Sequence, residues 1–367
     1  MVRYNISWFG GRVLGENRIK RNDRNSSIAY ISLMNVIAAF SVVILHANVS
    51  FWLDRSKPFW AVSNVIESVF YFAVPVFFMI TGITLADYKD RYSTKTFFKK
   101  RIEKTLIPYI VWSVLAALFM LATGVLKPAD ITPVWIITSV IWTNNIITYY
   151  WFFGALFVFY LLMPVIASIK KEQKLTVFKC FIIIIFIINV FVFFILRLLG
   201  MYPEVIDTSG IGLGNLIFVF LGYYVYKKPP TLIAKIVIYI LALAGLLVHM
   251  IGTYQLSMRA GHIDELFKNY PDFPSVFFGL GMFILLRDIA AKIEKIGWLK
   301  KFFEFLGNYN FEVFLLHWFI INITDLIIKA DKHSLVYSLI FPLLIYAVII
   351  PVTWCLRKIP VIRKIVP

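Results

Sequence analysis

Long apolar runs alternate with short charged segments along the whole chain. Ten of these runs are long enough to cross the ~30 Å hydrocarbon core of a bilayer, which takes a helix of about 20 residues. They cover residues 28–50, 61–85, 105–125, 149–169, 180–199, 210–226, 236–256, 273–290, 305–328 and 335–356. The runs are continuously apolar and do not alternate, which excludes a closed barrel. The pattern predicts an all-α, polytopic transmembrane helix bundle with ten spans, plus or minus one.

Composition supports this interpretation, and the distribution of charge predicts the orientation of the bundle in the membrane. The chain is 60% hydrophobic with a mean hydropathy of +0.80, far above a soluble domain of 367 residues. With the N-terminus inside, the inner segments hold 29 of the 37 lysines and arginines. Because basic residues accumulate on the cytoplasmic side, both termini are expected to be cytoplasmic. The net charge of +17 then reports topology and attraction to anionic lipid, and gives no reason to invoke nucleic acid.

The expected organisation is one membrane domain with short cytoplasmic ends. Residues 1–27 are polar and basic and lack a cleavage site, so the first span is expected to be an uncleaved anchor. Residues 28–356 form the membrane domain, and residues 357–367 form a cytoplasmic tail. The two cysteines, Cys180 and Cys355, predict neither a disulfide nor a metal site. The expected location is the cell membrane, with multiple passes.

Ionisable residues inside apolar spans are the candidates for function, because they are costly to keep there. His46 lies near the outer end of the first span, and Asn35 lies eleven residues before it. Eleven residues are almost three helical turns, so both side chains share one face, about 16 Å apart along the axis. His46 alone could equally be a helix-packing residue, but the rest of the chain favours a functional role.

Glu67 in the second span lies at about the depth of His46. A carboxylate there costs ~2.5–3.5 kcal/mol unless it is paired or faces water. Pairing with His46 would offset this cost and would raise the basicity of the imidazole. The ninth span adds polar and ionisable residues along its length, so the bundle is expected to enclose a polar cavity. These residues are Glu312, His317, Asn322 and Asp325.

The segment before the third span predicts a short amphipathic helix at the inner interface. Phe97 and Phe98 interleave there with basic residues, and Pro108 opens the span that follows. Lipid headgroup binding is the simpler explanation for such lysines. The functional alternative is a phosphate clamp, since arginine forks and lysine charges both bind phosphate. The basic residues are Lys99, Lys100, Arg101 and Lys104.

Together these stretches resemble the acyltransferase-3 family, integral membrane acyltransferases that O-acetylate cell-surface glycans. The resemblance covers residues 28–320, and the stretches occur in the family's order. They are Asn35 to His46, Val74 to Gly82, Phe97 to Pro108 with Tyr109 and Trp112, Trp151 to Phe153 with Tyr160 and Pro164, and Gly307 to His317.

The resemblance implies transfer of an acyl group, usually acetyl from acetyl-CoA, to a hydroxyl of a sugar or related envelope acceptor. His46 matches the catalytic histidine, while Arg101 and Lys104 match the cytoplasmic basic pair. Trp151 and His317 lie in matching motifs and are expected to help bind substrate. Asn35 departs from the family, which usually has arginine there, and asparagine cannot neutralise a phosphate. Either donor binding leans more on Arg101 and Lys104, or this chain belongs to a divergent branch with altered donor use.

The resulting hypothesis is vectorial transfer without a bound cofactor or metal. The nucleotide end of acyl-CoA binds near Lys100, Arg101 and Lys104, and the pantetheine arm passes Asn35 to reach His46. His46 is then the general base, oriented by Glu67. The rival is a proton-coupled transporter or flippase for a polar or lipid-linked solute, in which buried His and Glu relay protons. The sequence leaves the acceptor, the acyl chain and the oligomeric state open.

Overall fold

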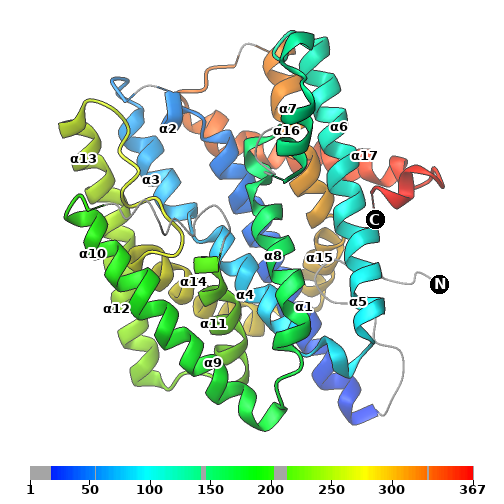
Figure 1. Ribbon diagram of the computed structural model, residues 1–367, viewed down its shortest axis with the longest axis vertical. Coiled ribbons are helices and arrows are strands. Elements are labelled where there is room, and N and C mark those ends of the chain that lie inside the picture. Colours follow the sequence, from blue (N-terminus) through cyan, green and yellow to red (C-terminus); the bar gives the residue numbers. More distant parts are fainter. Residues whose placement is uncertain (1–17, 54, 142–145, 202–212, 329, 367) are drawn as a thin grey trace.

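The computed structural model describes residues 18–53, 55–141, 146–201, 213–328 and 330–366, which contain helices, turns and no strand (Figure 1). The predicted all-α class is confirmed over these residues; residues 1–17 of the predicted N-terminal segment lie outside them. The helices are α1 Arg18–Ala47, α2 Ser50–Leu53, α3 Trp60–Phe70, α4 Ala73–Leu85, α5 Thr94–Arg101, α6 Ile107–Ala122, α7 Pro133–Ile141, α8 Trp151–Ile166, α9 Lys171–Ile185, α10 Phe193–Leu198, α11 Leu216–Lys227, α12 Leu232–Leu247, α13 Thr253–Ala260, α14 Phe273–Ile293, α15 Gly297–Gly307, α16 Asn310–Ile327 and α17 Phe341–Leu356.

Several of these helices continue into one another through a wider π-helical turn. Such turns join α5 to α6, α9 to α10 and α12 to α13. The first of them, Ile102–Leu106, lies directly before Pro108. A proline ring clashes with the preceding turn of a regular helix, and the wider turn lets the chain stay helical across it. The amphipathic segment predicted as a separate interfacial helix is therefore continuous with the third span.

Eight helical stretches among the described residues are long and apolar enough to cross a membrane. They correspond to eight of the ten predicted spans. The other two segments are also helical: α11 has 12 residues and α14 has 21. These helices indicate a multi-pass membrane protein. The predicted number of ten spans and the predicted cytoplasmic position of both termini stay predictions.

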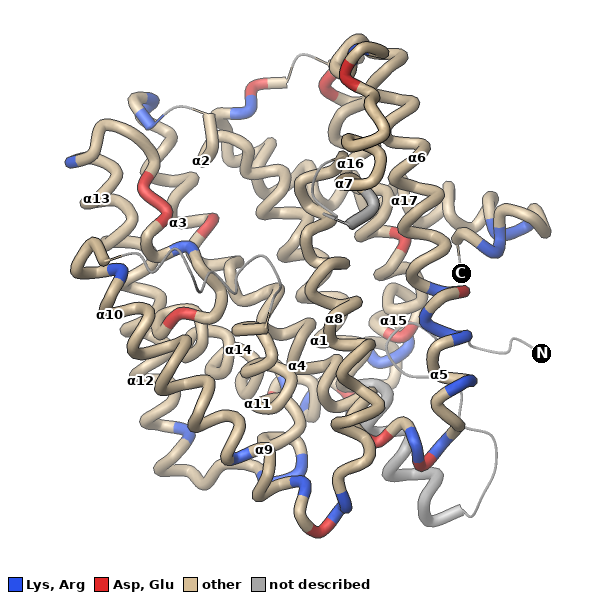
Figure 2. Tube along the Cα trace, viewed as in Figure 1, with Lys and Arg blue, Asp and Glu red and all other residues tan. Residues whose placement is uncertain are grey.

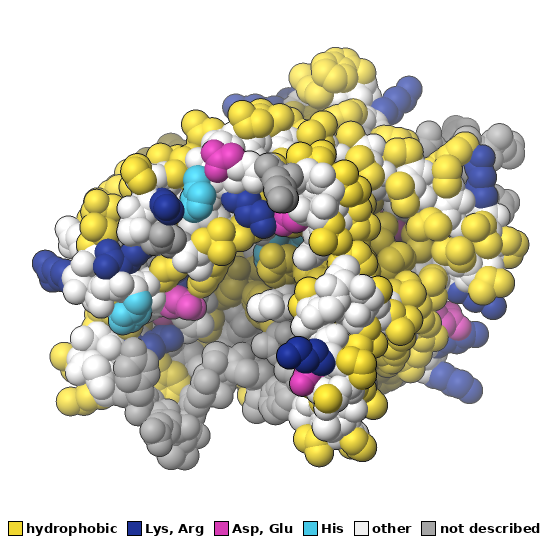
Figure 3. All heavy atoms as spheres, turned by 90° about the horizontal axis from the view of Figure 1, so that it is seen from above, with side chains coloured by type: hydrophobic (Ala, Val, Ile, Leu, Met, Phe, Trp, Pro, Cys, Tyr) yellow, Lys and Arg dark blue, Asp and Glu magenta, His cyan; other side chains and the backbone are white. Residues whose placement is uncertain are grey.

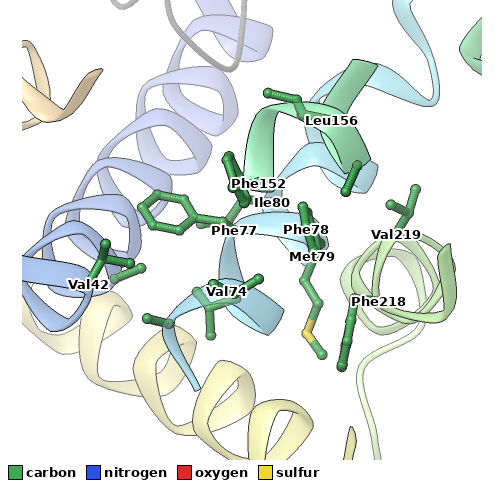
Figure 4. Close-up of a cluster of buried hydrophobic side chains, with 14 of the residues drawn as sticks. Val42, Val74, Phe77, Phe78, Met79, Ile80, Phe152, Leu156, Phe218 and Val219 are labelled. Carbon is green, nitrogen blue, oxygen red and sulfur yellow. The ribbon is translucent and has the colours of Figure 1, made fainter. Parts of the chain in front are cut away.

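The core lies where α4 packs against α1, α8 and α11, and it is built almost entirely of apolar side chains (Figure 4). Val42 of α1, Phe77 and Phe78 of α4, Phe152 of α8 and Phe218 of α11 meet there, and all are buried. Phe78 stacks on Phe152 with ring centroids 4.9 Å apart. These contacts hold α4 at the centre of the bundle.

Two glycines let the backbones of α4 and α11 approach closely. A Cβ atom on Gly82 would overlap the carbonyl oxygen of Val219, and one on Gly222 would overlap the backbone of Met79. Small residues at such crossings are typical of membrane helix pairs, which associate by close van der Waals contact.

The outside of the bundle is apolar, as a lipid-facing surface requires. Large aliphatic side chains such as Leu161, Ile233 and Leu344 are more than half exposed. Figure 2 shows most charged positions near the lower and upper ends of the bundle, with a largely uncharged zone between them. A few charged residues lie inside that zone, and they are part of the site described next.

Candidate active site

The first long helix carries the two polar residues that the sequence singled out. α1 is uninterrupted from Arg18 to Ala47, so Asn35 and His46 share a face as predicted. Asn35 is buried with 8% of its surface exposed, and its Oδ1 has no hydrogen-bond partner among the described residues. His46 lies in the last turn of α1 and is half-buried.

Two rings from other segments stack on the His46 ring at this end of α1. The His46 imidazole stacks on Tyr149, with centroids 3.4 Å apart and planes inclined by 14°. It also stacks at 5.1 Å on the imidazole of His317 from α16. The structure thus brings together two histidines that lie far apart in the sequence, and a tyrosine holds the first of them from a third segment.

His317 has a defined tautomer because one ring nitrogen lies against a carbonyl. Its Nδ1 is 3.0 Å from the carbonyl oxygen of Val313, and a carbonyl can only accept, so Nδ1 carries the proton. The other nitrogen, Nε2, is buried and has no partner among the described residues. His317 therefore presents an unpaired acceptor in the interior of the bundle, beside His46.

Glu67 is buried on α3, but its hydrogen-bond partner is Asn48. The Asn48 Nδ2 atom donates to Glu67 Oε2 at 3.2 Å and to the carbonyl of Ser63 at 2.9 Å, and Ser63 Oγ donates back to Asn48 Oδ1 at 2.9 Å. Glu67 makes no direct hydrogen bond to His46 among the described residues. In place of the predicted pairing, Glu67 is bonded to Asn48, which follows His46 by two residues in the chain.

A buried lysine lies on the other side of Glu67. Lys268 belongs to the segment between α13 and α14, is 9% exposed, and donates to Ser68 Oγ at 3.0 Å. Its ammonium lies 5.3 Å from the ring centroids of both Phe51 and Tyr71. Burial lowers the pKa of Lys268 to about 8, and the negative charge of Glu67 opposes this shift. The two buried charges therefore stabilise each other.

The other ionisable residues of the ninth predicted span are paired with cations. Glu312 of α16 is 1% exposed and forms an ion pair with Arg357, whose NH2 atom lies 2.7 Å from Glu312 Oε1. Asp325 near the upper end of α16 pairs with Lys332 at 2.6 Å. These pairs offset the cost of burying the carboxylates.

The basic helix α5 lies at the lower end of the bundle. Its N-terminus is capped by Ser93, whose hydroxyl accepts from the Thr96 amide. Arg101 points inward and is only 4% exposed, with its guanidinium 5.5 Å from the Phe97 ring and 5.4 Å from the Tyr160 ring. Lys100 lies over the Tyr92 ring at 4.1 Å, and Lys104 is half-buried. The buried, inward position of Arg101 differs from that of an arginine that binds lipid headgroups at the surface.

Seen from above, the upper face of the molecule is hollowed near its centre (Figure 3). Charged and histidine side chains gather on this face among hydrophobic ones. Trp151, the first residue of α8, is half-buried and follows Tyr149 by two residues. The sequence-based reasoning missed Tyr149, Asn48 and Lys268. The run Tyr149, Tyr150, Trp151 was a signal for the first of these, whereas nothing in the sequence indicated that Lys268 folds inward.

The family of the chain follows from its comparison with known families. The model of the acyltransferase domain of the acyltransferase-3 family matches residues 28–358, which include every site residue above. No curated protein and no solved structure matches the chain. The chain belongs to the acyltransferase-3 family, and it is a membrane acyltransferase.

Proposed function

We propose that this protein transfers an acyl group, acetyl in the simplest case, from acyl-CoA on the cytoplasmic side to a hydroxyl of an envelope glycan or lipid-linked saccharide. Membership of an acyltransferase family supports the reaction class. The observation that carries the proposal is the cluster of three nearly parallel rings, His46, Tyr149 and His317, at the end of α1.

His46 is proposed as the general base. It accepts the proton of the acceptor hydroxyl while the hydroxyl oxygen attacks the thioester carbonyl. The new C–O bond forms, the C–S bond breaks, and the imidazolium returns its proton to the sulfur of the leaving CoA. Base catalysis of this kind contributes typically 10²–10⁴-fold. An acyl-His46 intermediate is the covalent variant of the same chemistry.

The neighbours of His46 are proposed to position its ring. Tyr149 covers one face of the imidazole, and His317 lies nearby in a nearly parallel plane. Glu67 would act indirectly: it accepts a hydrogen bond from Asn48, which fixes the backbone just past the end of α1. A ring fixed by packing and hydrogen-bonded support keeps the reacting atoms in the productive geometry.

The donor is proposed to enter from the lower end of the bundle. Lys100, Arg101 and Lys104 would bind the phosphates of acyl-CoA, because their charges are held together on one helix. The pantetheine arm would then pass Asn35. The unpaired Oδ1 of Asn35 can accept from an amide N–H of that arm, a contact that the family's usual arginine cannot make.

The experiment is acetyl-CoA binding to the purified, detergent-solubilised protein by calorimetry. Arg101→Gln removes the inward charge, and Lys99→Gln is the matched control, since Lys99 is exposed on the same helix and pairs with Glu103. We expect wild type and Lys99→Gln to bind alike and Arg101→Gln to bind at least tenfold more weakly. Absence of binding by folded wild-type protein would remove the proposal and favour a transporter.

A further inference from the structure

The helix α15 is too short to cross the membrane. Its 11 residues, Gly297–Gly307, extend over about 16 Å, roughly half of the ~30 Å hydrocarbon core. It connects α14 to α16 and follows the eighth predicted span, on the side of the membrane that is expected to be cytoplasmic. None of its residues is fully buried. The position of α15 therefore depends on what its separate faces contact.

One face of α15 packs against the first long helix. Leu299, Phe303 and Leu306 recur at helical spacing and are half-buried, and α15 contacts α1. The two helices approach closely at Gly307, where an added Cβ atom would lie 3.3 Å from the Cβ atom of Ser32. This face thus supports the half of α1 that lies farther from the proposed base.

The neighbouring face of α15 is apolar and exposed. Trp298, Phe302 and Phe305 are spaced by four and three residues, so their side chains lie on one narrow strip of the helix. Their exposed fractions are 70%, 48% and 46%. Three large rings facing water would be costly, because each exposes a large apolar area. A helix that does not span can shelter such rings at the membrane boundary, where tryptophan is enriched.

The charge around α15 indicates which lipids meet this face. Its remaining face is polar and carries Lys300, Lys301 and Glu304. Residues 292–304 contain four lysines and two glutamates. The end of α17 adjoins this segment, since Arg357 donates to the carbonyl of Asn308 at 2.9 Å, and residues 357–366 add four basic residues and no acidic one. An exposed aromatic strip beside an excess of basic charge matches a leaflet of anionic lipid.

We propose that α15 lies in the cytoplasmic interface of the membrane and binds anionic phospholipid. The rings of Trp298, Phe302 and Phe305 enter the boundary between headgroups and acyl chains, while Lys300 and Lys301 contact lipid phosphates. Lysine acts as a point charge, so the site selects lipids by charge. The inference does not depend on the proposed acyl transfer, and it assigns α15 a role as a lipid-bound support of α1.

The test uses Trp298 as a reporter in the full-length protein. Nanodiscs contain phosphatidylcholine with a minor fraction of phosphatidylglycerol, and brominated acyl chains are placed on one lipid or the other at equal bromine content. Bromine quenches indole fluorescence on contact. The contribution of Trp298 is the difference between wild type and Trp298→Phe. Trp52 on α2, which is 48% exposed and far from α15 (Figure 1), is measured in the same way with Trp52→Phe as the control.

We expect brominated phosphatidylglycerol to quench Trp298 about fivefold more per bromine than brominated phosphatidylcholine at low salt, because each lysine near the surface enriches anionic lipid by roughly this factor. The preference should be lost in Lys300→Gln/Lys301→Gln and at high salt. It should be kept in Lys57→Gln/Lys127→Gln, which removes two exposed lysines from the side predicted to be outer. Thermal unfolding checks that each variant is folded.

Three results would overturn the proposal. Equal quenching of Trp298 by both lipids would reject selection of anionic lipid. An unchanged preference in Lys300→Gln/Lys301→Gln would reject the role of these lysines. Absence of quenching by either lipid would mean that another partner covers the aromatic strip, and a doubled particle mass in light scattering would identify that partner as a second copy of the chain.

Discussion

Removal of the Lys268 charge is expected to destabilise the protein, because it leaves Glu67 buried without a counter-charge. Lys268→Met keeps the length of the side chain and deletes the ammonium. Glu67 is 4% exposed and, among the described residues, would keep its hydrogen bond from Asn48. Lys268 and Glu67 interact electrostatically, and a buried charge that loses its compensating charge costs about 3–5 kcal/mol. Converting the remaining carboxylate to an amide in Lys268→Met/Glu67→Gln should recover most of this loss.

The same pair gives a pH dependence with a defined sign. The folded-state pKa of Lys268 is about 8, below its ordinary value of 10.5. The unfolded chain therefore binds the proton at pH values where the folded protein has released it, and stability rises with pH through this window. Lys268→Met, which cannot titrate there, should lack this rise.

Both effects are measured by denaturant titration in detergent micelles, followed by tryptophan fluorescence, for wild type and the two variants. Three results would refute the reasoning: a Lys268→Met protein within about 1 kcal/mol of wild type, a double variant no more stable than Lys268→Met, or the same pH profile in both proteins. Any of these would mean that water or another group compensates Glu67.

Two further substitutions test the packing of the bundle and of the site. Gly82→Ala places a methyl group against the Val219 carbonyl and should lower the free energy of unfolding by about 1–3 kcal/mol. Gly297→Ala is the control, because Gly297 has open space around it and its substitution should leave the stability unchanged. Equal thermal stabilities of the two variants would contradict the close packing of α4 and α11. Tyr149→Ala should lower the turnover of acetyl-CoA by about tenfold or more, because His46 loses the ring that it stacks on. Tyr149→Phe keeps this ring and should turn over acetyl-CoA at close to the wild-type rate. An equal loss in both variants would assign the effect to the Tyr149 hydroxyl.

Helical periodicity was sufficient to predict how residues are arranged along one helix. Asn35 and His46 were expected on one face, and α1 is unbroken between them. The rotation of one helix relative to its neighbours is a different matter, because it depends on packing between helices. Glu67 has the depth expected for a partner of His46, yet its side chain is bonded to Asn48. The position of a residue along its span predicts its depth in the membrane, but it does not predict which residues of other helices its side chain contacts.

Pro108 lies in the first turn of α6, as predicted for a proline that opens the third span, whereas the π-helical turn that makes α5 and α6 continuous was not predicted. Local sequence also does not reveal a partner that is distant in the chain. The loop that carries Lys268 and Tyr270 has a polar sequence typical of a solvated connection. Its inward lysine depends on the charge of Glu67, some 200 residues earlier in the chain, and no local pattern reports such a partner.

The central claim is that His46 is the base of an acyl transfer, and its most direct test is the turnover of acetyl-CoA. Purified protein in lipid nanodiscs, without any gradient, is assayed for release of CoA with wild type and His46→Ala. The account predicts release by wild type and a 10²–10⁴-fold loss in the variant, at unchanged acetyl-CoA binding. Appreciable turnover by His46→Ala would contradict the assignment of His46, and absence of turnover in wild type that binds acetyl-CoA would contradict acyl transfer to water or soluble hydroxyls at this site.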